Sequence, residues 1–135
     1  MKSFVLSLLL LVVIIASVFF LLPSAPNAAA KTDFQDESVR LTVVSNEDAA
    51  ERMRRTSFTL TLEDLKGQPI QRADLKVILQ MPNMLCGNIP TEIVEDKPGS
   101  YVITGIPVMQ GSWEAQISLR MPDKLVRVDH PFSTH

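Results

Sequence analysis

The sequence predicts an all-β fold, a seven-stranded immunoglobulin-like β-sandwich preceded by an N-terminal hydrophobic helix. Short segments after residue 38 alternate apolar and polar residues, and turn-forming residues separate these segments. This period of two is the pattern of a strand with one buried and one solvated face. Seven such strands in about 95 residues, joined by short turns, are typical of a two-sheet sandwich.

The predicted hydrophobic helix is the apolar run from Phe4 to Leu22, which only two serines interrupt and which Lys2 precedes. A helix of roughly 20 residues crosses a bilayer core, so the run is long enough for an anchor. The small residues Ala28, Ala29 and Ala30 also fit a signal-peptidase site. Residues 1–30 are therefore expected to be a membrane anchor or a signal peptide with a linker. We expect the rest of the chain to be extracytoplasmic and membrane-anchored, or secreted if residues 1–30 are cleaved.

Residues 31–38 are polar and have no apolar period, so we expect a tether there and the folded domain at 39–135. The segment 46–56 does not alternate and is expected to be a loop. Turn residues at 65–70, 95–100 and 121–124 separate later segments. The expected strands are 39–45, 57–64, 74–81, 91–95, 101–105, 113–120 and 124–132. Their inward faces predict a core that includes Leu60, Val77, Leu79, Tyr101, Trp113 and Ile117.

The charge pattern and the histidine positions exclude two classes of function. The chain has 13 basic and 15 acidic residues, a formal net charge of −2. Nucleic-acid-binding domains carry a basic excess, so no nucleic acid is expected as a partner. The two histidines, His130 and His135, occur within the last six residues, and no serine or cysteine has an evident histidine base. An enzyme is therefore not expected, although the two imidazoles would bind a metal if the tail were ordered.

The segment QMPNMLCGNIP, residues 80–90, places three sulfurs close together: Met81, Met84 and the single cysteine, Cys86. A Pro-Asn turn brings Met81 and Met84 to within about 7 Å at the Cα atoms, and in extended chain Met84 and Cys86 point the same way. Thioethers and thiolates select Cu(I) over hard cations. The alternative is packing, because methionine fills irregular gaps and lone cysteines are commonly buried. Met109 is either a fourth sulfur ligand or a loop residue that packs on Trp113.

Several short motifs in this region resemble the YtkA-like domain family. They are Met81-Pro82-Asn83-Met84, Gly99-Ser100-Tyr101 and Met109-Gln110-Gly111-Ser112-Trp113, after the approach LKGQPIQRADLKVIL at 65–79. The resemblance implies an immunoglobulin-like sandwich outside the membrane, similar to CopC-type copper-handling domains that accompany metal transport and cytochrome oxidase assembly. Family members carry a histidine or a glycine-rich stretch after the second methionine. This chain has Leu85-Cys86-Gly87 there, which puts a histidine-containing site in doubt.

Two functions follow as expectations. The first is a membrane-tethered domain that binds or delivers Cu(I) through Met81, Met84 and Cys86, with Met109 as an outside candidate. The second is a non-catalytic protein–protein interaction module of the cell envelope with no metal, which predicts an exposed apolar patch. Three arginines at 51–55 belong either to a solvated loop or to a contact with anionic lipid headgroups or an acidic partner.

Overall fold

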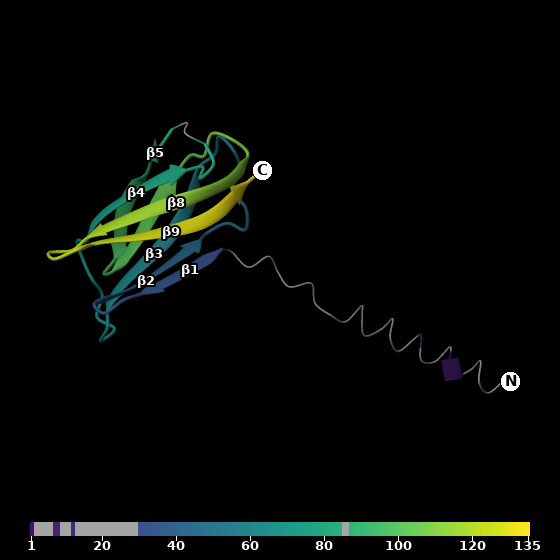
Figure 1. Cartoon of the computed structure of the whole chain (residues 1–135), viewed down its shortest axis with the longest axis horizontal. Helices are drawn as coiled ribbons and strands as arrows, with labels where there is room; N and C mark the ends of the chain where they lie inside the picture. The colour runs from purple at the N-terminus through teal and green to yellow at the C-terminus, as the bar shows by residue number, and fades with distance from the viewer. Residues whose placement is uncertain (2–6, 9–11, 13–29, 85–86) are drawn as a thin grey trace.

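The computed structural model describes residues 1, 7–8, 12, 30–84 and 87–135. The described strands form two antiparallel sheets that pack face to face (Figure 1). One sheet has the order β1-β2-β3-β7-β6 and the other β5-β4-β8-β9. The strands are β1 (Lys31–Gln35), β2 (Val39–Ser45), β3 (Thr56–Asp64), β4 (Asp74–Gln80), β5 (Ile89–Pro90), β6 (Glu92–Lys97), β7 (Ser100–Gly105), β8 (Gly111–Arg120) and β9 (Leu125–Thr134).

The alternation of apolar and polar residues determines which side of each strand faces the core. Along β3, Phe58, Leu60 and Leu62 are buried, whereas the threonines between them are half-buried on the other face. Along β8, Trp113, Ala115, Ile117 and Leu119 are buried in the same way. All six predicted core residues, Leu60, Val77, Leu79, Tyr101, Trp113 and Ile117, are at most 3% exposed, which confirms the predicted core.

The described part of the chain contains nine strands, which corrects the prediction of seven. β1 lies within the range expected to be a tether, and β5 is a two-residue strand beside β4. β1 pairs with β2 along its whole length, and its one large apolar residue, Phe34, packs against the core. Main-chain pairing therefore holds a strand whose residues are too polar to show an apolar period.

The predicted N-terminal helix lies almost wholly outside the described residues. Within the described ranges, no helix is both long enough and apolar enough to cross a membrane. The buried apolar core lies between Val39 and Val128, and the nine strands lie between Lys31 and Thr134. Residues 30–135 therefore contain the whole described fold and its core.

Charged and polar groups hold the end of the sandwich where β1 ends and β2 begins. The Asp36 carboxylate accepts hydrogen bonds from the backbone N–H groups of Ser38 and Val39 at 2.8 and 2.9 Å. Its other oxygen lies 2.6 Å from Lys124 Nζ, on the turn before β9. The ammonium group of Lys124 and these N–H donors lower the pKa of Asp36 well below its ordinary value. This contact links the two sheets at that end.

Contacts of Tyr101 and Gly99 fix the chain at the same end of the sandwich, beside β7. The Tyr101 hydroxyl donates to the Ile70 carbonyl at 2.8 Å and accepts from the Ala73 N–H at 3.0 Å, which fixes the segment before β4. Gly99, which precedes β7, has a φ of +74°. A Cβ at Gly99 would lie 2.6 Å from the Pro69 Cβ and 2.8 Å from the Leu62 carbonyl oxygen, so only glycine fits there.

Candidate functional site

The methionine segment after β4 forms the turn that the sequence predicts. The Met84 N–H donates to the Met81 carbonyl at 3.1 Å, which closes the Met-Pro-Asn-Met turn. Met81 is half-buried and packs against the core. A Cβ at Gly111 would lie 2.8 Å from the Met81 Cε, so the end of the Met81 side chain rests against the start of β8. Met84 is 47% exposed at the tip of the turn.

Met109 lies at the same end of the sandwich, just before β8, and its backbone is firmly held. Its carbonyl accepts hydrogen bonds from Trp113 Nε1 at 2.9 Å and from Thr134 Oγ1 at 2.6 Å. Its side chain is 43% exposed. The fold therefore brings Met81, Met84 and Met109 to one end, where the first two come from the segment after β4 and the third from the segment before β8.

The fourth predicted ligand, Cys86, lies outside the described residues. Among the described residues, no group of three or more His, Cys, Asp or Glu side chains is arranged to hold a metal ion. Three thioethers at one end remain compatible with a soft-metal site, because methionine sulfur is itself a soft ligand. The metal site of Met81, Met84, Cys86 and Met109 stays a prediction.

Three further apolar residues at this end were not among the site residues expected from the sequence. Met53, Ile106 and Val108 are 66%, 40% and 47% exposed. The Met53 N–H donates to the Pro107 carbonyl at 2.7 Å, so the segment between β2 and β3 touches the segment between β7 and β8. We call the five exposed side chains at this end the loop end; they are Met53, Met84, Ile106, Val108 and Met109.

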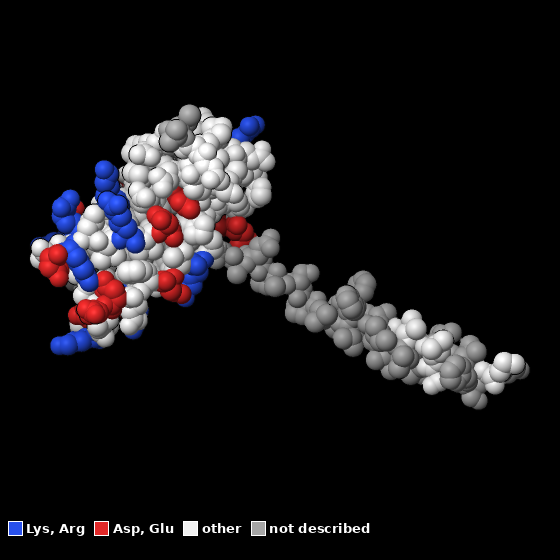
Figure 2. Space-filling model, viewed as in Figure 1, with Lys and Arg blue, Asp and Glu red and all other residues white. Residues whose placement is uncertain are grey.

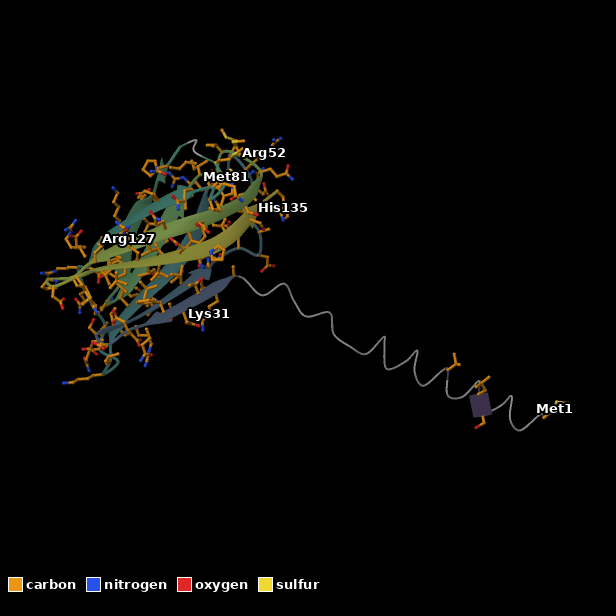
Figure 3. All side chains as sticks on the ribbon, viewed as in Figure 1. Met1, Lys31, Arg52, Met81, Arg127 and His135 are labelled. Carbon is orange, nitrogen blue, oxygen red and sulfur yellow. The ribbon has the colours of Figure 1, made fainter. Side chains whose placement is uncertain are left out.

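The loop end differs in composition from the rest of the visible surface. Figure 2 shows an almost uncharged region at the top of the domain, whereas most of the charged side chains visible on this face lie toward the opposite end. Figure 3 places Met81, Arg52 and His135 together at that top end. The sequence segments 81–88 and 106–110 contain no charged residue, which is the signal from which this part of the surface could have been found, whereas the segment 46–55, which carries Met53, contains six.

A hollow of about 310 Å³ opens beside the loop end. Its lining includes the aromatic rings of Phe58, Trp113 and Phe132, together with Glu47 and Asp48 from the segment after β2. The Phe58 and Phe132 rings meet edge to face with centroids 5.0 Å apart, and the Phe132 and Trp113 rings stack at 6.3 Å. The hollow therefore combines aromatic and acidic groups in one shallow depression.

His130 has a structural role between the two sheets. Its side chain is fully buried on β9, and its Nδ1 and Nε2 lie 2.8 Å from Thr32 Oγ1 and 2.9 Å from Ser45 Oγ. Burial lowers the pKa of His130, because a buried imidazolium loses its hydration. Both ring nitrogens are occupied, whereas His135 is exposed at the chain end. The arrangement does not support the alternative in which the two histidines bind a metal together.

Comparison with known proteins gives the fold and no closer relationship. Neither the family models nor the curated proteins yield a match. Among solved structures, the Lin-41 filamin domain matches with a TM-score of 0.51 and 16% identity, over 84% of this chain and 96% of that one. Domains 4 and 5 of the S-layer protein SbsC match with a TM-score of 0.43 and 13% identity, over 84% and 80%. The first match, together with the two antiparallel sheets, shows that the chain has an immunoglobulin-like β-sandwich fold.

Proposed function

We propose that this protein is a non-catalytic interaction module of the cell envelope that binds an apolar partner surface through its loop end. One observation carries the proposal: five large apolar side chains at 40–66% exposure gather in three segments at one end of a well-packed sandwich. Single exposed apolar residues are ordinary on protein surfaces, but a contiguous cluster marks an interaction site.

Hydrogen bonds hold the backbone of the loop end at two places. The Met109 carbonyl accepts two hydrogen bonds, and the Met53 N–H is bound to the Pro107 carbonyl. A preformed surface binds with a smaller entropic cost than one that orders on contact. Three of the five side chains are methionines, whose unbranched thioethers adapt to partners of different shape.

The expected location agrees with such a role. The apolar run from Phe4 to Leu22 would tether the module to a membrane, or direct it for secretion if residues 1–30 are cleaved. A tethered module meets partners in or near that membrane at a high effective concentration. The proposed class of partner is therefore another component of the same membrane, exposed on its outer side.

Site-specific photo-crosslinking in native membranes tests this function. A photoreactive amino acid replaces Val108 at the loop end, or Lys66 at the opposite end as a matched exposed control. We expect adducts from position 108 and none from position 66. Adding Met53→Asp should abolish the adducts from position 108, because it places a charge in the same apolar surface. Equal adduct formation from both positions, unaffected by Met53→Asp, would contradict the proposal.

A second candidate function is Cu(I) binding and delivery. It is favoured by the gathering of Met81, Met84 and Met109 at one end, with Cys86 two residues after Met84 in the sequence. The resemblance to the YtkA-like family supports the same chemistry, and a β-sandwich is the fold that this family would have. A shallow set of sulfur ligands would pass Cu(I) to a metal transporter or an oxidase-assembly partner by ligand exchange, without a redox step.

A competitive Cu(I) titration of residues 30–135 under reducing conditions tests this second function. One equivalent should bind to the wild type, and both Met84→Ala and Cys86→Ser should weaken that binding. Met121→Leu is the control, because Met121 lies at the opposite end, in the turn between β8 and β9. If the chelator retains all the copper, the sulfurs serve packing and the loop end acts without metal.

A further inference from the structure

We propose that the apolar partner of the loop end is the lipid bilayer itself, at the headgroup and upper acyl level. This inference rests on the proposed function, since it names the partner of the same surface. It also requires the segment from Phe4 to Leu22 to insert in that bilayer. Three features carry it: where the chain enters the domain, which side chains lie at that end, and which of its segments contain no charged residue.

The chain enters the sandwich at the loop end. The Ala30 carbonyl accepts a hydrogen bond from the Ser45 N–H at 2.9 Å, and Lys31, the first residue of β1, pairs with Val44. Ser45 is the last residue of β2, directly before the segment that carries Met53. The residue that follows the N-terminal segment is therefore fixed at the same end as the exposed apolar side chains.

The connecting chain is short. Residues 23–30 follow the apolar run and reach the domain, and eight residues span at most roughly 26–29 Å when fully extended. This distance is on the scale of a small domain, so the domain stays close to the bilayer. Because the chain enters at the loop end, that end is the one held nearest to the membrane.

The side chains at the loop end suit a lipid interface. Methionine, isoleucine and valine side chains there enter the boundary between headgroups and acyl chains as the apolar face of an interfacial helix does. Arg52, next to Met53, is exposed and forms no ion pair with any described residue, whereas Arg54 pairs with Glu51 at 3.0 Å. A free guanidinium beside an apolar side chain can reach a lipid phosphate while its neighbour inserts.

The opposite end is less suited to the same contact. Its turns carry both signs of charge, and facing the bilayer there would remove these groups from water at a high cost. The charged residues in those turns are Asp36, Glu37, Lys66, Arg72, Asp123 and Lys124. The loop end also carries charges, but they all lie in the segment between β2 and β3: Glu47, Asp48, Glu51, Arg52, Arg54 and Arg55. Its other two segments, 81–88 and 106–110, contain no charged residue, so the apolar side chains there can face the bilayer while the charged segment stays at the headgroup level.

Depth-dependent fluorescence quenching on the full chain tests the inference. In a Cys86→Ser background, Val108→Cys or, as the control, Lys66→Cys is labelled with a polarity-sensitive dye. Each protein is reconstituted in vesicles of phosphatidylcholine and phosphatidylglycerol that contain a nitroxide lipid with its spin label at the upper acyl level. We expect quenching at position 108 to be several-fold greater than at position 66, and Met53→Asp to reduce it.

The outcomes separate this inference from the proposed function. If the protein floats with the vesicles but the two labels are quenched equally, the loop end does not touch lipid and the inference is overturned. Protein adducts from position 108 in native membranes would then leave the interaction function standing with a protein partner. If the full chain does not float with the vesicles, the tether is wrong and the inference falls with it.

In a second arm, residues 30–135 alone are mixed with the same vesicles in the absence of the spin label. The fragment should bind weakly, and Met53→Asp should lower its partition coefficient by roughly tenfold, the effect of withholding one apolar side chain from the interface. The matched control, Lys66→Asp at the opposite end, should leave the partition coefficient within about twofold of the wild type. Equal losses in both variants would contradict docking through the loop end.

Discussion

Replacing His130 by leucine tests how the two sheets are held together where β9 meets β1 and β2. Leucine fills much of the space of the imidazole ring but makes neither hydrogen bond. The Ser45 hydroxyl, 7% exposed, then loses its 2.9 Å partner, and the half-buried Thr32 loses its 2.8 Å contact. Leaving a buried hydroxyl without a partner costs about 1–3 kcal/mol, so His130→Leu should lower the free energy of unfolding by that amount near pH 7.5.

The difference should shrink in acid. The pKa of His130 in the folded protein lies below its ordinary value of 6.5 because the ring is buried among neutral hydroxyls and the Phe58 ring. Below pH 6.5 the unfolded wild-type chain therefore binds a proton that the folded protein does not, and the wild type loses stability. The loss is at most about 1.4 kcal/mol per pH unit, or about 2 kcal/mol between pH 6.5 and 5.0. The leucine variant has no titratable group at position 130, so its stability lacks this pH dependence.

The assay is urea unfolding of residues 30–135, followed by the fluorescence of the single tryptophan, Trp113, from pH 7.5 to 5.0. His135→Asn is the matched control, because His135 is exposed at the chain end and should leave the pH dependence unchanged. A constant difference between the wild type and His130→Leu across this range would refute the reasoning, and so would a difference that grows as the pH falls.

Further substitutions test the contacts at Gly99, Tyr101 and Asp36. The free energy of unfolding of each variant is measured by urea unfolding, as above. Gly99→Ala should cost roughly 2–4 kcal/mol because a Cβ meets backbone and ring atoms at positive φ, whereas Gly67→Ala, at φ +78° with open space around it, should cost only about 1 kcal/mol. Equal costs would show that the contacts at Gly99 do not matter. Tyr101→Phe should cost about 1–3 kcal/mol, since the carbonyl and N–H that its buried hydroxyl bridges lose their partner; an unchanged stability would contradict this. Asp36→Asn should flatten the loss of stability below pH 3.8, where the unfolded wild-type chain takes up a proton at Asp36 that the folded protein, with its lowered pKa, takes up only in stronger acid; an unchanged loss of stability in this range would contradict this.

The period of two predicted the strands whose side chains alternate between core and solvent, and it missed strands held by other means. β3 and β8 carry the clearest alternation, and both formed within one or two residues of the expected range. β1 has one large apolar residue, Phe34, and is held mainly by main-chain pairing with β2. β5 consists of Ile89 and Pro90, too few residues for any period. Main-chain pairing leaves little trace in composition, so such strands escape pattern reasoning.

The candidate site was predictable only where it depends on local chain geometry. Pro82 and Asn83 predicted the turn that joins Met81 and Met84, because these residues favour the central positions of a turn. The loop end was not predicted, because exposure in an irregular segment depends on distant contacts. Pro107, for example, is buried while both of its neighbours are exposed.

His130 also shows that local sequence patterns do not reveal contacts between distant residues. It lies near the end of the chain, where side chains are usually solvated. Its hydrogen-bond partners, Thr32 and Ser45, lie 98 and 85 residues away in the sequence. No local pattern reveals that these two hydroxyls and the imidazole meet between the sheets, so the structural role of this histidine required the fold.

Methionine oxidation by hydrogen peroxide, read residue by residue by mass spectrometry, tests most directly that a partner covers the loop end. The full chain in native membranes is compared with residues 30–135 in solution. Met53, Met84 and Met109 are exposed at the loop end, and Met121, half-buried at the opposite end, is the internal control. We expect the first three to oxidise several-fold more slowly in membranes while Met121 is unchanged. Equal oxidation rates of Met53, Met84 and Met109 in both samples would show that the loop end is uncovered, and would contradict the account.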